Sequence, residues 1–209
     1  MSDWEIIRHA VAISGRVSNS QTGKPIRSAR VAITEAPTEF TDWLETRAKQ
    51  IGAKWQGMLE RPDRTLTAAD GHFHFMDLPN GDYTLAASLP GDGSRYGVAE
   101  EGASVTRGTE GNIIMATVDI QLPPTTLKGT ITTETTEGTV PVVLAEVRVA
   151  GSGEKAYSDQ QGRYLLSGLE KGLRTVQVSA RGFESVNQPV GFVAAGAEEI
   201  LDLVLVAQT

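Results

Sequence analysis

Alternating apolar and polar side chains predict short strands in two stretches of the chain. Phe73 and Phe75 alternate with histidines, and Val176 and Val178 alternate with polar residues. Successive side chains of a strand point to opposite faces, so this pattern is typical of strands with one buried face. An Asp-Gly step at residues 70–71 supplies the positive φ angle that a tight turn needs. The pattern favours hairpins over helices.

The same strand-turn-strand pattern occurs twice. Residues 67–88 align with residues 158–179 at a constant offset of 91 positions and without a gap. The aligned pairs are Gly71/Gly162, Phe73/Tyr164, Phe75/Leu166, Leu78/Leu169, Gly81/Gly172, Leu85/Val176 and Ala87/Val178. Earlier segments, residues 29–33 and 145–149, align at an offset of 116. Self-similarity of this kind indicates a duplicated structural unit.

The change in offset means that the first copy holds about 25 extra residues between Ile33 and Thr67. We therefore expect two domains, residues 1–124 with an insertion at about 38–63, and residues 125–209. A chain of 209 residues suits two domains of about 100 residues each.

The order of these motifs resembles the carboxypeptidase regulatory-like domain. Gly-x-Val/Ile occurs at Gly15 and Gly129, Ala-x-Val-x-Val/Ile follows, and the Gly-x-aromatic block comes next. The resemblance covers both copies except residues 38–63, and it implies transthyretin-like sandwiches. We thus predict an all-β chain of two tandem seven-stranded antiparallel β-sandwich domains, the first with an inserted α-helix. Such a fold hosts many functions, so function must come from a site.

The insertion has the pattern of an amphipathic helix. Apolar residues recur every three to four positions between residues 39 and 60, and Pro62 is a stop signal. The candidate partner-binding residues on this stripe are Phe40, Trp43, Leu44, Ile51, Trp55 and Met58. Two interpretations remain open. The helix either caps the first sandwich and buries its stripe there, or part of the stripe docks onto a partner, since Trp is enriched among interface anchors.

Charge and residue usage exclude several classes of function. The net charge is −7 with no basic stripe, so we expect no nucleic-acid binding. The chain has no cysteine and three histidines. His72 and His74 share one strand face, but a zinc site needs three or four ligands, so we expect no metal. Nucleophile, phosphate-loop and dinucleotide motifs are missing from the sequence. We predict no enzyme activity and no cofactor.

The remaining expectations concern place and partner. The first five residues lack the basic region of a signal peptide, and no apolar run approaches the length of a bilayer span. We therefore expect a cytoplasmic protein without membrane insertion. Residues 4–7 predict an added edge strand or a docking arm.

The resemblance implies a structural or protein-binding component of a larger assembly, such as a phage-tail-like or contractile injection particle. The alternative is an exported adhesion or carbohydrate-binding module. A glycan is the less expected ligand, because the repeats carry no clustered aromatic platform. Cell fractionation separates the two hypotheses.

Overall fold

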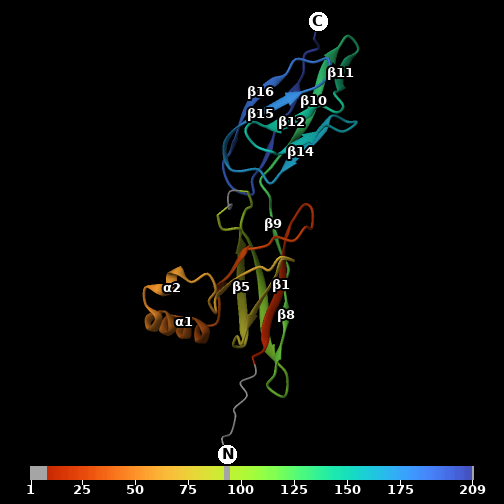
Figure 1. The fold of residues 1–209 in the computed structure, drawn as a ribbon. Helices are drawn as coiled ribbons and strands as arrows, with labels where there is room; N and C mark the ends of the chain where they lie inside the picture. Colours follow the sequence, from red (N-terminus) through yellow and green to blue (C-terminus); the bar gives the residue numbers. More distant parts are fainter. Residues whose placement is uncertain (1–8, 92–94, 209) are drawn as a thin grey trace, which may run out of the picture. The chain divides into compact units, whose positions relative to one another are not determined.

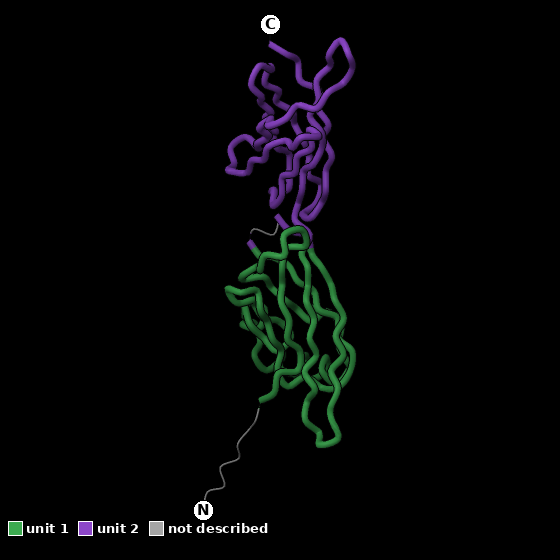
Figure 2. Tube along the Cα trace, turned by 90° about the vertical axis from the view of Figure 1, so that its right-hand side faces the viewer, with its two compact units in different colours: residues 1–90, 98–122 green, residues 91–97, 123–209 purple. Residues whose placement is uncertain are grey.

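The structure, a computed structural model, describes residues 9–91 and 95–208. The segment at residues 4–7 lies outside this part. The chain divides into two compact units (Figure 2): unit 1 holds residues 1–90 and 98–122, and unit 2 holds residues 91–97 and 123–209. The short segment 91–97 belongs to unit 2 because Arg95 binds Glu154 and Glu170 there.

Unit 1 consists of two β-sheets and a helical insertion (Figure 1). The first sheet is built around β1, and its members are β1 (Val11–Asn19), β4 (His72–Met76), β8 (Ala116–Thr117) and β9 (Ile120–Leu122). The second has the order β3 (Arg64–Leu66), β2 (Arg30–Glu35), β5 (Gly81–Ser88), β6 (Ala99–Arg107) and β7 (Ile113–Ile114). Both sheets contribute fully or almost fully buried side chains to the core, among them Ile13, Phe73, Val31 and Leu85.

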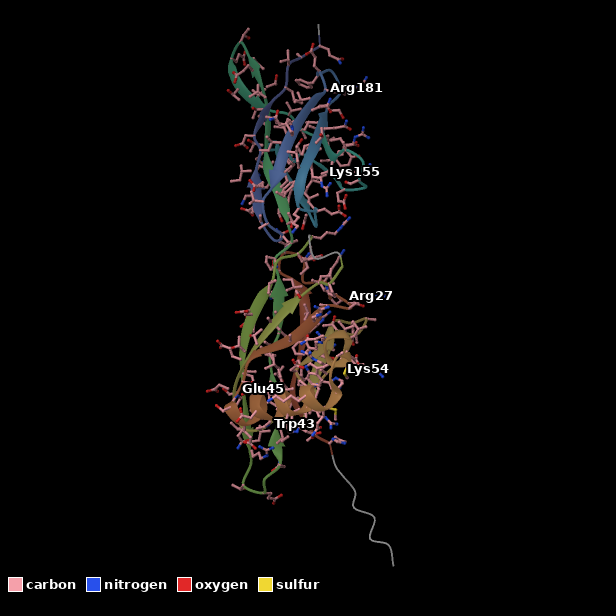
Figure 3. All side chains as sticks on the ribbon, turned by 90° about the vertical axis from the view of Figure 1, so that its left-hand side faces the viewer. Arg27, Trp43, Glu45, Lys54, Lys155 and Arg181 are labelled. Atoms are coloured by element: carbon pink, nitrogen blue, oxygen red, sulfur yellow. The ribbon has the colours of Figure 1, made fainter. Side chains whose placement is uncertain are left out.

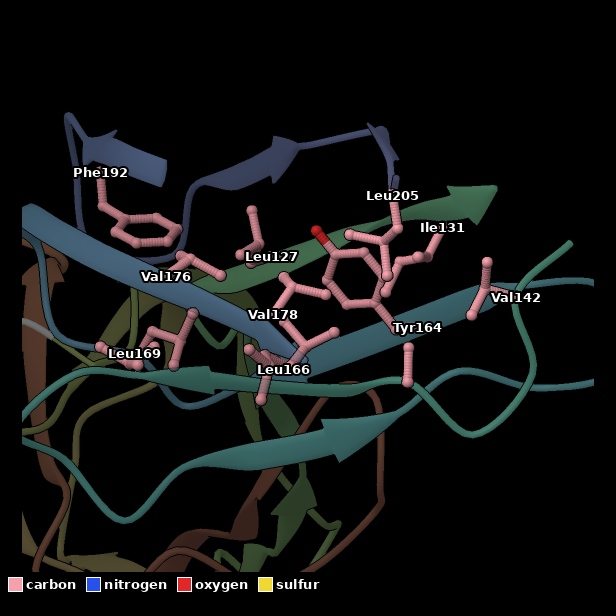
Figure 4. Packing of buried hydrophobic residues seen from close by; sticks show 13 residues of the cluster. Leu127, Ile131, Val142, Tyr164, Leu166, Leu169, Val176, Val178, Phe192 and Leu205 are labelled. Atoms are coloured by element: carbon pink, nitrogen blue, oxygen red, sulfur yellow. The ribbon is translucent and has the colours of Figure 1, made fainter. Parts of the chain in front are cut away.

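Unit 2 repeats this plan without the helices. Its first sheet contains β10 (Thr126–Thr135), β11 (Gly138–Pro141), β14 (Arg163–Ser167), β17 (Glu198–Ile200) and β18 (Leu203–Val204). The second has the order β13 (Lys155–Tyr157), β12 (Glu146–Val149), β15 (Gly172–Ser179) and β16 (Val186–Phe192). One cluster of buried side chains fills the space between the sheets, with Leu127 and Ile131 from one and Val176 and Val178 from the other (Figure 4).

The predicted all-β sandwich fold is confirmed, with two differences in detail. The described part of each unit has nine strand segments rather than seven, because the closing strand is broken in two and a short strand is added, β7 in unit 1 and β11 in unit 2. The closing segments also run parallel to the first strand, β8 and β9 to β1, and β17 and β18 to β10. The other ladders are antiparallel.

The break in the closing strand explains the first glycine of each repeat. A Cβ atom added to Gly15 would lie 1.6 Å from the carbonyl oxygen of Val118, the residue that follows β8. In unit 2 a Cβ on Gly129 would lie 1.9 Å from the carbonyl oxygen of Leu201. The next residue in unit 1, Asp119, accepts a hydrogen bond from the Arg16 amide at 2.9 Å. Only glycine leaves room for this backbone approach.

A buried hydroxyl recurs at the same place in both units. Thr67 Oγ1 donates to the Ile26 carbonyl at 2.6 Å and accepts from the Ala29 amide at 2.9 Å. Ser158 Oγ, 91 positions later, makes the same pair of bonds with Val142 and Ala145, at 2.7 and 2.9 Å. Each hydroxyl therefore joins two backbone segments inside its unit.

We expect Thr67→Val and Ser158→Ala each to lower the free energy of unfolding by about 1–3 kcal/mol, because both changes leave a buried amide and carbonyl without a partner. Urea unfolding measures the loss. Thr34→Val, at an exposed position of β2, is the control and should have little effect. Equal stabilities for Thr67→Val and Thr34→Val would contradict the role given to the buried hydroxyl.

The insertion forms two helices, α1 (Thr38–Ile51) and α2 (Lys54–Gly57), instead of one helix through residue 60. Gly52 ends α1 with φ +69°, a left-handed conformation that glycine adopts without strain. In the sequence, the apolar residues keep their spacing of three to four positions across Gly52, which is why the sequence predicts one helix. The backbone direction changes at this glycine, so Trp55 does not lie on the same helix as Trp43.

Candidate binding groove beside the helical insertion

A groove of about 660 Å³ lies beside the insertion of unit 1. Its walls are residues 39–43 of α1, residues 60–65, and residues 74–79 at the end of β4. Ligand sites commonly have volumes of about 300–1,000 Å³. The groove therefore has the size of a binding site, and its lining combines aromatic and aliphatic side chains with a few charged groups.

Phe40 attaches α1 to the sandwich. Its side chain is 4% exposed, and its ring meets the ring of Tyr83 edge-on with centroids 5.9 Å apart. Its other contact is a stacked one with Trp43, also at 5.9 Å. Trp43 is 46% exposed, and Figure 3 labels it on the helix. Phe40 therefore holds the helix in place while Trp43 remains accessible at the groove.

Tyr83 supports this contact as a neutral hydrogen-bond donor. Its hydroxyl donates to the carbonyl of Pro79 at 2.8 Å. Burial, together with the nearby carboxylate of Glu39, raises the pKa of Tyr83 to about 12. The hydroxyl thus keeps its proton at neutral pH. Its hydrogen bond to Pro79 holds the connection between β4 and β5 in place beside the groove.

The edge of β4 that faces away from β1 is open at two residues. The Gly71 carbonyl accepts from the Val17 amide, and the Asp77 amide donates to the Ala10 carbonyl. Backbone groups of a strand alternate in direction, so His74 and Met76 turn theirs away from β1. Within the described part of the chain these two residues have no backbone partner on that side.

The groove lies along this open edge. Residues 74–77 form one of its walls, and α1 and residues 60–65 form the others. Closer to the start of β4 the edge is covered, because the His72 carbonyl accepts from the Ala68 amide at 2.8 Å. The unpaired backbone groups of β4 are therefore concentrated where the groove begins.

Two arginines line the groove and differ in their partners. Arg61 binds Asp63 through two hydrogen bonds of 2.8 and 2.5 Å, and its guanidinium lies 4.7 Å from the centre of the Trp55 ring. Arg64 donates through Nη2 to the Gln56 carbonyl at 3.0 Å. Its Nε is buried and has no partner in the described structure. Nε of Arg64 is thus a donor without a partner that the surrounding atoms enclose.

The environment of Arg64 is also electrostatically unfavourable. Burial lowers the pKa of Arg64, the neighbouring guanidinium groups of Arg61 and Arg30 lower it further, and the carboxylate of Asp63 offsets part of this effect. Arginine nevertheless stays charged at neutral pH. A carboxylate placed against the outer nitrogens of the Arg64 guanidinium would offset the repulsion.

The six candidate residues of the insertion have different environments. Phe40 and Trp43 line the groove together. Trp55 is 7% exposed and packs under Arg61, and Leu44, Ile51 and Met58 are half-buried away from the groove lining. Sequence reasoning missed His74 and Met76 as groove residues, because alternation carries no signal for which strand edge remains open. It also missed Arg64, whose surroundings depend on tertiary packing.

Two of the three histidines, His9 and His72, have acidic neighbours. His9 bonds to Asp77, and His72 Nδ1 lies 3.1 Å from a carboxylate oxygen of Asp70. Across residues 9–91 and 95–208, no three His, Cys, Asp or Glu side chains gather as metal ligands. Among the helices of the same residues, none is long and apolar enough to cross a membrane.

Comparison with known proteins gives a family and distant structural likenesses. A family model described as the carboxypeptidase regulatory-like domain matches residues 12–115 and 126–206. The search of curated proteins found no match.

Two of the similar solved structures are pilins. The shaft pilin SpaA of Lactobacillus rhamnosus GG is 12% identical, with 97% of this chain and 98% of the pilin covered and a TM-score of 0.40. A minor pilin of Streptococcus agalactiae is 11% identical, with 94% and 96% covered and a TM-score of 0.34.

A cohesin–X-dockerin complex of Acetivibrio cellulolyticus is 20% identical over 40% of this chain, with a TM-score of 0.32. The match spans 58% of the length of that protein. At these TM-scores the structural likenesses carry no argument about function.

Proposed function

The chain belongs to the carboxypeptidase regulatory-like domain family, and on that premise we propose that it is a non-catalytic structural component that binds protein within a larger assembly, such as a phage-tail-like or contractile injection particle. The observation that carries the proposal is the groove of unit 1, which joins an exposed tryptophan, an open strand edge and an arginine without an ion pair among the described residues. As part of the proposal, assembly takes place in the cytoplasm.

The insertion supports a binding role because unit 2 builds the same sandwich without it. The core of unit 2 is closed by its own strands, so helices are not a requirement of this fold. In unit 1 the insertion uses Phe40 for attachment and leaves Trp43 accessible. We retain the stripe as the partner-binding element: Trp43 is its contact in the groove, Leu44, Ile51 and Met58 are candidate contacts outside the groove, and Phe40 and Trp55 are its supports.

We expect Trp43→Ala to weaken partner binding at least tenfold, because an exposed tryptophan beside a groove has the features of an interface anchor. Stability should change little, since Trp43 is half-exposed. The measurement is affinity capture from the native cell, quantified by mass spectrometry and repeated with the purified partner. Tyr157→Ala, at an aromatic residue of unit 2 that is 51% exposed, is the matched control.

Recovery of the same partners at the same level by the wild type and Trp43→Ala would contradict the proposed site. If the protein bound glycans on an array in a way that depends on Trp43, and no protein partner were recovered, the alternative of an exported adhesion or carbohydrate-binding module would be favoured. Fractionation of the native cell tests the place of action, and recovery from the cell exterior alone would contradict cytoplasmic assembly.

A further inference from the structure

We propose that the groove of unit 1 receives an extended peptide segment of the partner, which adds a strand to the open edge of β4 and places one acidic side chain against Arg64. This inference rests on the proposed function and specifies how the same site recognises its partner. The peptide would pair with the backbone of His74 and Met76 and lie between β4 and α1.

The open edge supplies the backbone recognition. His74 and Met76 together present two amide donors and two carbonyl acceptors away from β1, as the direction of the Gly71 and Asp77 bonds shows. Unpaired groups on a strand edge are a template for another extended chain. The covered carbonyl of His72 limits the pairing to the part of β4 that borders the groove.

The groove walls set the side-chain preference. Side chains of an added strand alternate between two faces, so every second one would point toward Phe40, Trp43 and Phe75, which line the groove. Apolar side chains suit these positions. The walls therefore favour a segment with alternating apolar residues over a uniformly polar one.

Charge complementarity selects the acidic residue. Arg61 is already paired with Asp63, whereas Arg64 lines the groove and forms no ion pair of its own within the described residues. Glu39 and Glu60 also line the groove, and like charges repel acidic side chains elsewhere along it. The preferred segment thus has one carboxylate, located at Arg64, among apolar and neutral residues.

Unit 2 provides a matched edge without the helical wall. Leu165 of β14 corresponds to His74 at the offset of 91. The Ile131 amide bonds to the Gly162 carbonyl, and the Asp159 amide bonds to the Arg163 carbonyl. These bonds have the same direction as their counterparts in unit 1. Leu165 therefore turns its backbone groups away from β10 as His74 does from β1.

The test uses a displayed library of random dodecapeptides selected on the full chain. The best peptide is synthesised, and its dissociation constant is measured by calorimetry for the wild type, His74→Pro, Met76→Pro and Leu165→Pro. Proline removes an amide that the native ladder does not use, and edge positions tolerate it. We expect binding at least tenfold weaker for the first two variants and unchanged for Leu165→Pro.

The acidic contact is tested on the same peptide. Arg64→Gln should weaken the acidic peptide about tenfold and have little effect on the version with Asn or Gln in place of its acid. Circular dichroism and tryptophan fluorescence of each variant establish that it is folded. A peptide methylated at the two backbone nitrogens facing β4 should also bind at least tenfold more weakly.

The outcomes separate this inference from the proposed function. Partner and peptide binding that Trp43→Ala abolishes but the edge prolines leave intact would overturn strand addition while the proposed function stands. Binding insensitive to Trp43→Ala and to both prolines would overturn both. Failure to select any groove-dependent peptide overturns the inference. Concentration-dependent self-association of the chain would also overturn it if Met76→Pro removed that self-association, because the occupant of the groove would then be a second copy of this chain.

Discussion

Gly15→Ala lowers the free energy of unfolding of unit 1 by about 3 kcal/mol or more, at or beyond the upper end of the usual cost of overpacking a core. The added methyl group would lie 1.6 Å from the Val118 carbonyl oxygen and 2.9 Å from the Phe73 ring. Val118 cannot move aside freely, because its amide donates to the Ser14 carbonyl and the next residue, Asp119, binds the Arg16 amide. The closing strand must therefore shift or detach.

The repeat predicts the same result in unit 2. Gly129→Ala would place a methyl group 1.9 Å from the Leu201 carbonyl oxygen, and Asp202 holds the Thr130 amide at 2.7 Å just as Asp119 holds Arg16. We expect a loss of similar size, again about 3 kcal/mol, located in unit 2.

Urea unfolding distinguishes the two units through their chromophores. The tryptophans stand at positions 4, 43 and 55, all within residues 1–90, so tryptophan fluorescence follows unit 1 and far-ultraviolet circular dichroism follows both. The controls are the strand glycines Gly102→Ala and Gly191→Ala, where an added methyl group has no neighbour closer than 4.0 Å. If Gly15→Ala unfolded at the same urea concentration as Gly102→Ala, the close approach would be refuted.

Phe40→Ala lowers the free energy of unfolding of unit 1 by about 3 kcal/mol, as is typical when a buried phenylalanine is truncated. Phe40 is 4% exposed and provides the edge-on contact with Tyr83, so the change leaves a cavity where α1 meets the sandwich. The measurement is urea unfolding followed by circular dichroism and tryptophan fluorescence. Trp43→Ala is the control, with an expected loss below about 1 kcal/mol because the side chain is half-exposed.

This pair of variants decides between the two roles of the insertion. The structure gives Phe40 the role of a local anchor, and the proposed function gives Trp43 the role of a partner contact. If only Phe40→Ala lost stability and Trp43→Ala lost partner binding, the result would support a helix that is both anchored to the sandwich and in contact with the partner. A Phe40→Ala variant as stable as the wild type would contradict the anchoring of α1 by its aromatic contact.

The sequence predicts the faces of the strands well. Alternation in β4 assigns Phe73 and Phe75 to the core and His72 and His74 to the surface, and all four are found so. Alternation works here because a strand has only two faces. The offset of 91 then extends the assignment to β14, whose Tyr164 and Leu166 are buried.

Neighbour relations along a sheet are less predictable. Alternation says which face a residue occupies and does not say which strand lies beside it, so the parallel pairing of β9 with β1 and the open edge at Met76 had no signal in the pattern. The apolar spacing of the insertion wrongly indicated one continuous helix. The apolar spacing passes through Gly52, but a positive φ angle at that residue ends α1.

Only part of the candidate site could be predicted from the sequence. The insertion stood out because it interrupts the repeat, and two of its apolar residues, Phe40 and Trp43, do line the groove. Arg64 lies just outside the expected insertion, and its surroundings combine Arg61 of the same turn with Arg30 of β2, a distant part of the sequence. Such a tertiary arrangement cannot be read from residue spacing.

Hydrogen exchange of the full chain, with and without a saturating partner or selected peptide, tests the central claim most directly. We predict that the amides of His74 and Met76 exchange readily in the free protein and become protected on binding, while the amide of Leu165 does not change. Saturation of the chain without any gain in protection at His74 and Met76, or with protection confined to unit 2, would contradict the account.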